Sequence, residues 1–254
     1  AVGYNVGAAI STGAYNTLLG GLAGYSLTAG SYNVAIGYNA LAGENDHGRN
    51  IAIGTNALAV QDAGADAYNI AIGHNAGLAI STGTSNVLIG GAAGTALTDG
   101  ANNIAIGRAA LDTEDSGSNN IAIGYSALGT LNAGTAYNVA IGHNAGTAMT
   151  TGFNNTLIGG QAGYSLLGAT DNVLVGTFCG DNLTTGIRNV AVGTNALTAE
   201  DAHGYNVAVG HGTLQTQNAG ANAYNTAVGY EAGNQISTGV YNTIMGGLAG
   251  DSLT

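Results

Sequence analysis

Aliphatic residues recur along the chain in a fixed unit, in which an aliphatic residue, a small residue and a second aliphatic residue are followed by glycine. This signature returns every 17 residues, apart from one gap of 18 and two of 19, and so defines fifteen coils. Its glycines are Gly3, Gly20, Gly37, Gly54, Gly73, Gly90, Gly107, Gly124, Gly142, Gly159, Gly176, Gly193, Gly210, Gly229 and Gly246. A repeat of this length is typical of solenoids, in which successive coils stack on one another.

The three residues before each signature glycine, such as residues 34–36, predict a short β-strand. Val, Ile or Thr stands first and Ile, Leu, Val or Met third, an alternation that favours a strand with one face inward. We expect these two positions to face the core. The small residue between them, as in Ala35 and Ala52, would then permit close approach of neighbouring chains. Bulky exceptions such as Leu18 and Leu88 could set the register of an oligomer.

An asparagine stands immediately before each complete signature. Stacking the coils in register places these residues about 4.7–4.8 Å apart. We therefore predict a structural ladder in which each side-chain amide donates to one neighbour and accepts from the other. Asparagine also tolerates left-handed backbone, which suits a corner before a strand. The ladder residues are Asn16, Asn33, Asn50, Asn69, Asn86, Asn103, Asn120, Asn138, Asn155, Asn172, Asn189, Asn206, Asn225 and Asn242.

The rest of each coil predicts a glycine bend, a short second strand and a glycine-containing turn. The fourth residue after the signature glycine is either Gly, with an aliphatic residue at the seventh position, or Leu, with a mostly polar seventh residue. We interpret these as two ways of filling the same core volume: the large side chain stands at the fourth position or at the seventh, and the other of these two positions carries glycine or a polar residue. Coils of each kind come in pairs, which gives a superrepeat of about 70 residues. We predict an all-β parallel β-solenoid of about fifteen coils in a single array over residues 1–254.

Composition narrows the function classes. The formal net charge is −11, and the chain has three arginines and no lysine, which argues against binding to nucleic acids or to anionic membranes. No apolar run approaches the roughly 20 residues that span a bilayer, and the single Cys179 excludes an internal disulfide. Because no capping coil is recognisable at either end, we expect the chain to be a segment of a longer protein.

The candidate chemistry is sparse. Acidic pairs recur four or five coils apart, at Glu44 with Asp46, Glu114 with Asp115 and Glu200 with Asp201. At about 19–24 Å along the axis they cannot share an ion or a substrate bond, so we interpret them as a solvated loop face. The histidines fall in distant coils or beside these loops, where local ion pairs are the ordinary expectation. We predict no catalytic residues, no metal ligands, no cofactor and no enzymatic activity.

Tyrosine forms a second column, immediately before the ladder asparagine in seven coils. An exposed strip of this kind could stack on sugars or join an interface, or it could simply cover the turn, and the sequence leaves these alternatives open. The ligand-binding residues are otherwise unknown from the sequence. The strip consists of Tyr15, Tyr32, Tyr68, Tyr137, Tyr205, Tyr224 and Tyr241.

A family resemblance rests on coils such as residues 138–146, which read Asn-Val-Ala-Ile-Gly-His-Asn-Ala-Gly. They resemble the Asn-x-Val-Ala-Ile-Gly-x-x-Ala head repeats of trimeric autotransporter adhesins (YadA-like heads), and are similar to the repeat shafts of phage tail fibres. The resemblance implies a left-handed parallel β-roll, a homotrimer and an extracellular place on a cell surface or virion. No particular binding site carries over from these families.

We therefore expect a structural fibre or adhesin shaft that forms or presents a surface for attachment. Its partners would be copies of the same chain and a glycan or protein receptor on a host surface. The alternatives are a monomeric ice- or surface-binding solenoid and the subunit of a self-assembling extracellular filament. An ice-binding face needs the same threonine in every coil, whereas Thr12, Thr82, Thr151 and Thr238 recur in only one coil of each set.

Overall fold

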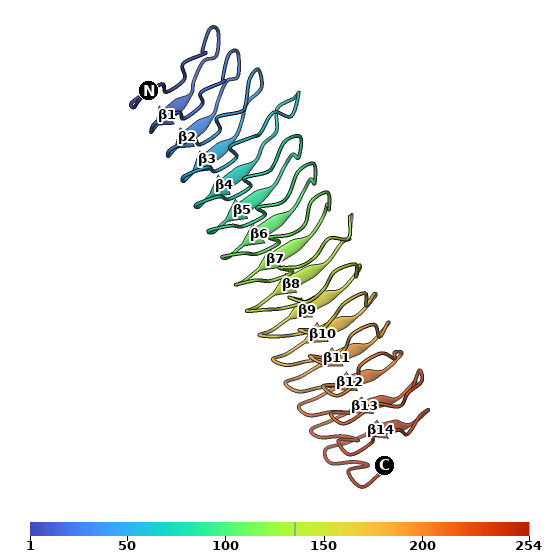
Figure 1. Ribbon diagram of the computed structural model, residues 1–254. Coiled ribbons are helices and arrows are strands. Elements are labelled where there is room, and N and C mark those ends of the chain that lie inside the picture. The colour runs from blue at the N-terminus through green and yellow to red at the C-terminus, as the bar shows by residue number, and fades with distance from the viewer. Residues whose placement is uncertain (135, 254) are drawn as a thin grey trace. The chain divides into compact units, whose positions relative to one another are not determined.

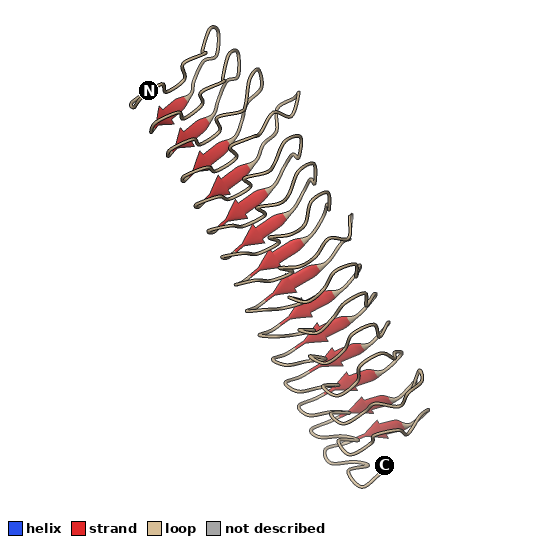
Figure 2. Ribbon diagram, viewed as in Figure 1, coloured by secondary structure: helices blue, strands red, loops and turns tan. Residues whose placement is uncertain are grey.

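A computed structural model describes residues 1–134 and 136–253 (Figure 1). The chain divides into two compact units, Ala1–Ser126 and Ala127–Thr254. Within the described residues each unit is all-β, with short strands joined by turns and no helix (Figure 2). Each strand is three residues long and ends directly before a signature glycine. The predicted parallel β-solenoid is confirmed, whereas a single array over residues 1–254 stays a prediction.

The strands of the first unit pair in parallel and in chain order, with equivalent residues of successive coils opposite one another. Ile51 pairs with Ile70 although 19 residues separate them, so the two additional residues loop out without shifting the register. An isolated bridge between Val2 and Leu19 adds the first, incomplete coil. The strands are β1 (Thr17–Leu19), β2 (Val34–Ile36), β3 (Ile51–Ile53), β4 (Ile70–Ile72), β5 (Val87–Ile89), β6 (Ile104–Ile106) and β7 (Ile121–Ile123).

The second unit repeats this arrangement. Its strands also pair in parallel, in chain order and in register, as Val173 with Val190 shows. The 19-residue coil between Val207 and Thr226 again keeps its register. The strands are β8 (Val139–Ile141), β9 (Thr156–Ile158), β10 (Val173–Val175), β11 (Val190–Val192), β12 (Val207–Val209), β13 (Thr226–Val228) and β14 (Thr243–Met245).

The inward position of every strand is its middle residue, not the aliphatic pair. In β3, Ala52 is fully buried while Ile51 and Ile53 are partly exposed, and the other strands follow the same pattern. The prediction that the aliphatic pair faces the core is therefore wrong, as is the outward placement of the small column. The coil interior is narrow, so one inward side chain per strand, Ala in most coils and Leu as at Leu88, fills the space beside the strand.

The predicted second strand is absent among the described residues. The second and fourth residues after the signature glycine have left-handed backbone, as Asn39 (φ 58°) and Leu41 (φ 51°) show, and the segment forms consecutive turns. Backbone bonds still join the coils here, for example from the Gly24 N–H to the Ala40 carbonyl at 2.9 Å. Because a strand needs negative φ at each residue, this segment stacks in parallel without becoming one.

The two kinds of coil fill the core reciprocally. In glycine-type coils, a Cβ added at Gly24 would lie 3.1 Å from Leu18, so the inward leucine occupies the space that a side chain at the fourth position would need. In leucine-type coils, Leu41 is fully buried beside the smaller Ala35. From the sequence, we expected the polar seventh residue of these coils to lie outside the core. Its side chain is instead buried as well, as at Glu44.

Candidate functional site

The asparagine column is the most regular polar feature of each unit. All but Asn16 and Asn242, which lie in the outermost ladder coils, are buried to 1% exposure or less. In the first unit, the backbone N–H of each asparagine donates to Oδ1 of the asparagine one coil earlier, over 2.9–3.0 Å along the series from Asn16 to Asn120. The equivalent bonds of the second unit measure 2.8–3.2 Å.

The side-chain amide nitrogens complete this network. The Nδ2 of Asn86 donates to the Gly100 carbonyl of the next turn at 2.8 Å, and Asn172 donates likewise to Gly186 at 2.9 Å. A direct amide-to-amide contact also exists, since Asn86 Nδ2 lies 3.2 Å from Asn69 Oδ1. Each Oδ1 nevertheless accepts mainly from the backbone N–H of the next asparagine. The column therefore holds together the residues that precede the strands and does not offer a free binding surface.

Buried polar side chains at the seventh position join this network. Gln61 accepts from Asn69 Nδ2 at 2.6 Å, and Gln217 accepts from Asn225 Nδ2 at the same distance. Glu44 Oε2 lies 3.5 Å from Asn50 Nδ2. The seventh position thus supplies an acceptor to the ladder from inside the coil.

The acidic residues at this position correct a sequence interpretation. Glu44, Glu114 and Glu200 are fully buried, so these glutamates do not belong to a solvated loop face. Asp46, which forms an acidic pair with Glu44 in the sequence, is exposed as expected. Burial is the largest influence on Glu44 and Glu200 and raises the pKa of each carboxyl, while a hydrogen bond from the backbone of the histidine three residues later opposes the shift. Each of these two carboxylates is therefore a costly group to bury and calls for a compensating partner.

Two clusters of possible metal ligands arise around these glutamates. One joins Glu44, His47 and Asp62, and the other joins Glu200, Asp201 and His203. In each cluster, one ligand atom per residue lies within 4.8 Å of the others. From the sequence, we placed His47 and His203 beside the acidic loops and expected local ion pairs there. We did not anticipate that Asp62 approaches the first pair from the next coil.

The tyrosine column of the first unit is a stack of flat groups. Tyr15 and Tyr32 lie face to face with ring centroids 5.0 Å apart. The Arg49 guanidinium continues the stack, 5.2 Å from the Tyr32 ring and 5.7 Å from the Tyr68 ring, and it forms a 2.7 Å ion pair with Asp66. The sequence strip omitted Arg49, although it stands in the same position before a ladder asparagine.

The second unit has a similar stack. Arg188 lies over Tyr205, the Tyr205 and Tyr224 rings are 4.9 Å apart, and Tyr224 and Tyr241 are 5.4 Å apart. Tyr137 lies in the same column and is exposed. Within a stack, the neighbouring groups cover the ring faces, so a sugar could reach mainly the ring edges and hydroxyls. This geometry favours covering the turns over stacking on sugars.

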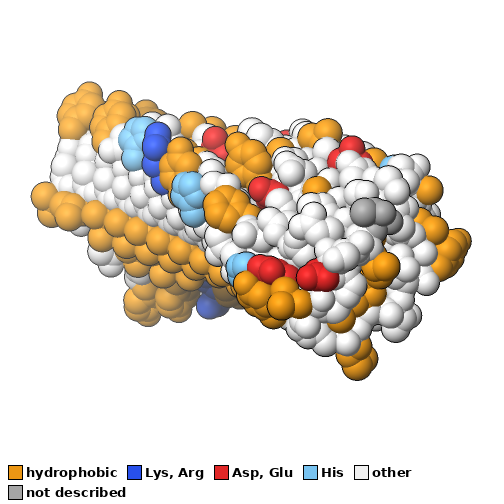
Figure 3. Space-filling model, turned by 90° about the horizontal axis from the view of Figure 1, so that it is seen from below, with side chains coloured by type: hydrophobic (Ala, Val, Ile, Leu, Met, Phe, Trp, Pro, Cys, Tyr) orange, Lys and Arg blue, Asp and Glu red, His pale blue; other side chains and the backbone are white. Residues whose placement is uncertain are grey.

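The outer strand face forms a second candidate surface. All strand residues are Thr, Val, Ile, Leu, Ala or Met, and the first and third residues of each strand are partly or fully exposed. Because strands pair in register, these side chains form two parallel columns in each unit, which are aliphatic except for a threonine at the first position of β1, β9, β13 and β14. Figure 3 shows hydrophobic side chains gathered in rows on the molecular surface. No described strand places a charged residue in these columns.

The remaining reactive residues are dispersed. His74, His143 and His211 are exposed, as expected for the position after the signature glycine. Cys179 is fully buried, and burial raises the pKa of its thiol to about 12. No helix in the described part of the chain has the length and hydropathy needed to cross a membrane.

Comparisons with protein-family models, curated proteins and solved structures give no match for this chain.

Proposed function

We propose that this chain is an extracellular structural segment, the repetitive shaft of an attachment fibre, in which copies of the chain pack against one another through their outer strand faces. The observation that carries this proposal is the pair of exposed, uncharged columns along the strands, which are aliphatic except for a threonine at the first position of β1, β9, β13 and β14. Ile51 and Ile53 in β3 and Val207 and Val209 in β12 are representative members.

An apolar face of this kind favours association. Contiguous exposed apolar patches larger than a few hundred Å² are uncommon on monomeric soluble proteins and generally mark an interface. Here the face also lacks charged side chains that would oppose contact between copies. Since each coil repeats the same two positions, the number of contacts grows with the number of coils.

A second copy is the occupant that the surface fits best. Identical chains present the same coil spacing, so aliphatic residues of one copy meet those of another in every coil. The resemblance to trimeric adhesin heads favours three chains around a common axis, with left-handed coils, and we propose this arrangement on that basis. It also supports a position on a cell surface or a virion.

Attachment would use exposed side chains that flank the strands, outside the two columns of the proposed interface. Hydroxyl groups of the stacked tyrosines and exposed histidines such as His74 and His143 offer hydrogen bonds to a glycan or protein receptor. With three arginines against fourteen acidic residues, a nucleic acid is a poor candidate partner. The proposal includes no catalysis.

The test is the mass of the purified protein in solution, measured by sedimentation equilibrium over a wide concentration range. We expect an assembly of three chains, each of 24.7 kDa. A monodisperse monomer at high micromolar concentration would overturn the shaft proposal and favour a monomeric surface-binding solenoid, which a thermal hysteresis assay would then test. An open-ended size distribution would instead indicate a filament subunit.

A further inference from the structure

Two equivalent turns, one in each unit, combine a buried glutamate with a histidine three residues later. Glu44 and His47 form the first pair and Glu200 and His203 the second. Both glutamate side chains are fully buried, while the histidine side chains are 33% and 27% exposed. Each pair therefore lies with its carboxylate in the interior and its imidazole at the edge of solvent.

Three side-chain atoms of these pairs lack a hydrogen-bond partner, although Oε1 of each glutamate accepts from the backbone N–H of its histidine, at 3.2 Å in the first pair and 3.1 Å in the second. The Nδ1 atoms of His47 and His203 are buried without a hydrogen bond, and so is Oε2 of Glu200. Nδ1 lies 4.0 Å from Glu44 Oε1 in the first pair and 3.4 Å from Glu200 Oε1 in the second. Buried polar atoms without partners are uncommon, so these atoms are free to bind a ligand of complementary charge.

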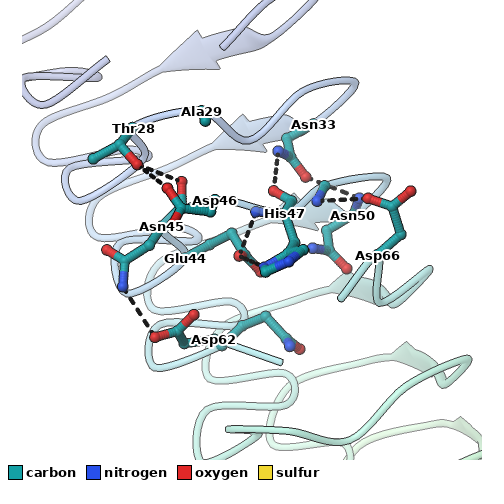
Figure 4. Close-up of polar contacts among 12 residues, drawn as sticks. Thr28, Ala29, Asn33, Glu44, Asn45, Asp46, His47, Asn50, Asp62 and Asp66 are labelled. Carbon is teal, nitrogen blue, oxygen red and sulfur yellow. Dashed lines mark hydrogen bonds and ion pairs between the residues drawn. The ribbon is translucent and has the colours of Figure 1, made fainter. Parts of the chain in front are cut away.

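An aspartate completes each cluster, but it comes from the next coil in the first cluster and from the same coil in the second. In the first unit, Asp62 reaches the pair from the following coil, and its Oδ2 accepts from Asn45 Nδ2 at 3.0 Å (Figure 4). In the second unit, Asp201 occupies the position equivalent to Asn45, and Asn218 occupies that of Asp62. Asp and Asn have exchanged places between adjacent coils, yet each cluster retains one glutamate, one histidine and one aspartate.

We propose that each cluster binds one divalent transition-metal ion of the zinc type, through the glutamate carboxylate, the histidine Nδ1 and the aspartate carboxylate. Zinc forms bonds of about 2.0–2.2 Å to nitrogen and oxygen in tetrahedral sites, which sets neighbouring ligand atoms roughly 3.4 Å apart. The Glu200–His203 separation already has this value. Water would supply the fourth ligand on the solvent side, where Asp62 and Asp201 are exposed.

The choice of ion follows from the ligands. Calcium takes six to eight oxygen ligands, whereas these clusters offer an imidazole nitrogen and only two carboxylates. Imidazole nitrogen suits zinc, copper and nickel. The positive ion would also offset the burial of Glu44 and Glu200, which no lysine or arginine contacts among the described ion pairs.

The chain contains its own control for this proposal. Glu114 is equally buried in the equivalent turn of another coil, but Gly117 stands where the histidine would be, and its N–H donates to Glu114 Oε1 at 2.8 Å. Glutamine is tolerated at the same position, since Gln61 and Gln217 are fully buried there. Glutamate-to-glutamine substitutions should therefore remove a metal ligand while preserving the fold.

The experiment is zinc titration by calorimetry at pH 7.5, with metal content measured after dialysis, on protein that carries no polyhistidine tag. We expect two zinc ions per chain in the wild type, one in Glu44→Gln, one in Glu200→Gln, none in the double variant and two in Glu114→Gln. Circular dichroism checks that each variant is folded. Absence of bound zinc in the wild type at micromolar concentrations, or two ions retained by the folded double variant, would overturn the proposal.

A second measurement separates the metal site from an ordinary ion pair. Cobalt(II) bound through a nitrogen and two carboxylates should give visible absorption bands, and these should halve in His203→Gln but persist in His143→Gln, whose histidine is exposed and outside the clusters. If the pairs act only as protonated histidine–glutamate contacts, no cobalt spectrum will develop in any variant. That result would exclude the metal site and leave the proposed shaft function unaffected.

Discussion

The backbone N–H of Asn189 donates to Oδ1 of Asn172, one coil earlier, at 2.8 Å, and both side chains are fully buried. Asn172 in turn donates from Nδ2 to the Gly186 carbonyl at 2.9 Å and from its own N–H to Asn155 Oδ1 at 3.1 Å. One side chain thus satisfies backbone groups that are buried away from solvent. This relationship explains why asparagine precedes every strand.

The first prediction concerns this ladder. Asn172→Ala should lower the free energy of unfolding by about 2 kcal/mol or more, because it leaves the Asn189 N–H and the Gly186 carbonyl without partners in the interior. Chemical denaturation followed by circular dichroism measures the change. Asn182→Ala is the control, since this exposed side chain should change stability by less than about 0.5 kcal/mol. Equal effects of the two substitutions would contradict the structural role of the ladder.

The second prediction compares neighbouring residues of β6. Ala105→Lys should prevent folding, because Ala105 is fully buried and the narrow interior has no room or partner for an ammonium group. Ile106→Lys should leave the coil folded, because its side chain is partly exposed on the outer face, but should weaken association between copies. Circular dichroism reports folding and sedimentation reports association. A folded Ala105→Lys variant together with an unfolded Ile106→Lys variant would reverse the assigned directions of the two side chains.

The third prediction concerns Cys179, whose thiol pKa burial raises to about 12 from an ordinary value of 9.0. The folded chain favours the neutral thiol, so its contribution to stability is complete below pH 9 and is lost as pH rises toward 12. Stability of the wild type should therefore fall more steeply above pH 9 than that of Cys179→Ala. Alanine is a suitable comparison because it fills this position in twelve coils. Parallel stability curves for the two proteins would contradict the prediction.

The same burial predicts low reactivity. The thiolate is the reacting form of cysteine, so a thiol reagent at pH 8 should label Cys179 only as fast as the surrounding coils open. The labelling rate should rise sharply in denaturant, where the thiol becomes accessible. Rapid labelling of the native protein would show that the coil around Cys179 is open.

The fourth prediction addresses the aromatic stack. Tyr205 and Tyr224 lie face to face, so a double-mutant cycle with alanine should give a coupling free energy of about 0.5–1.5 kcal/mol. The more distant pair Tyr137 and Tyr224 should be additive within about 0.5 kcal/mol. Equilibrium unfolding of the four proteins in each cycle provides the values. Additivity of Tyr205 and Tyr224 would mean that the ring contact contributes nothing to stability.

Much of the fold could be read from the sequence because the coils repeat. The spacing of the signature glycines predicted parallel stacking, and the pairing of Val173 with Val190 confirms it. The asparagine column was equally visible, since its position before each strand never varies. The first cluster of possible metal ligands was only partly visible in the sequence, because Glu44 and His47 are close in sequence whereas Asp62 belongs to the next coil.

The sequence by itself determined the coil length, the register and the position of each strand, because these follow from periodicity alone. Only the tertiary structure decided which side of the strand is inside. A segment such as Ile51-Ala52-Ile53 has apolar residues on both faces, so alternation cannot distinguish them. The size of the interior decides: residues with left-handed backbone such as Asn56 and Leu58 bend the chain back so closely that, of the three strand residues, only Ala52 fits inside, and the isoleucines lie outside.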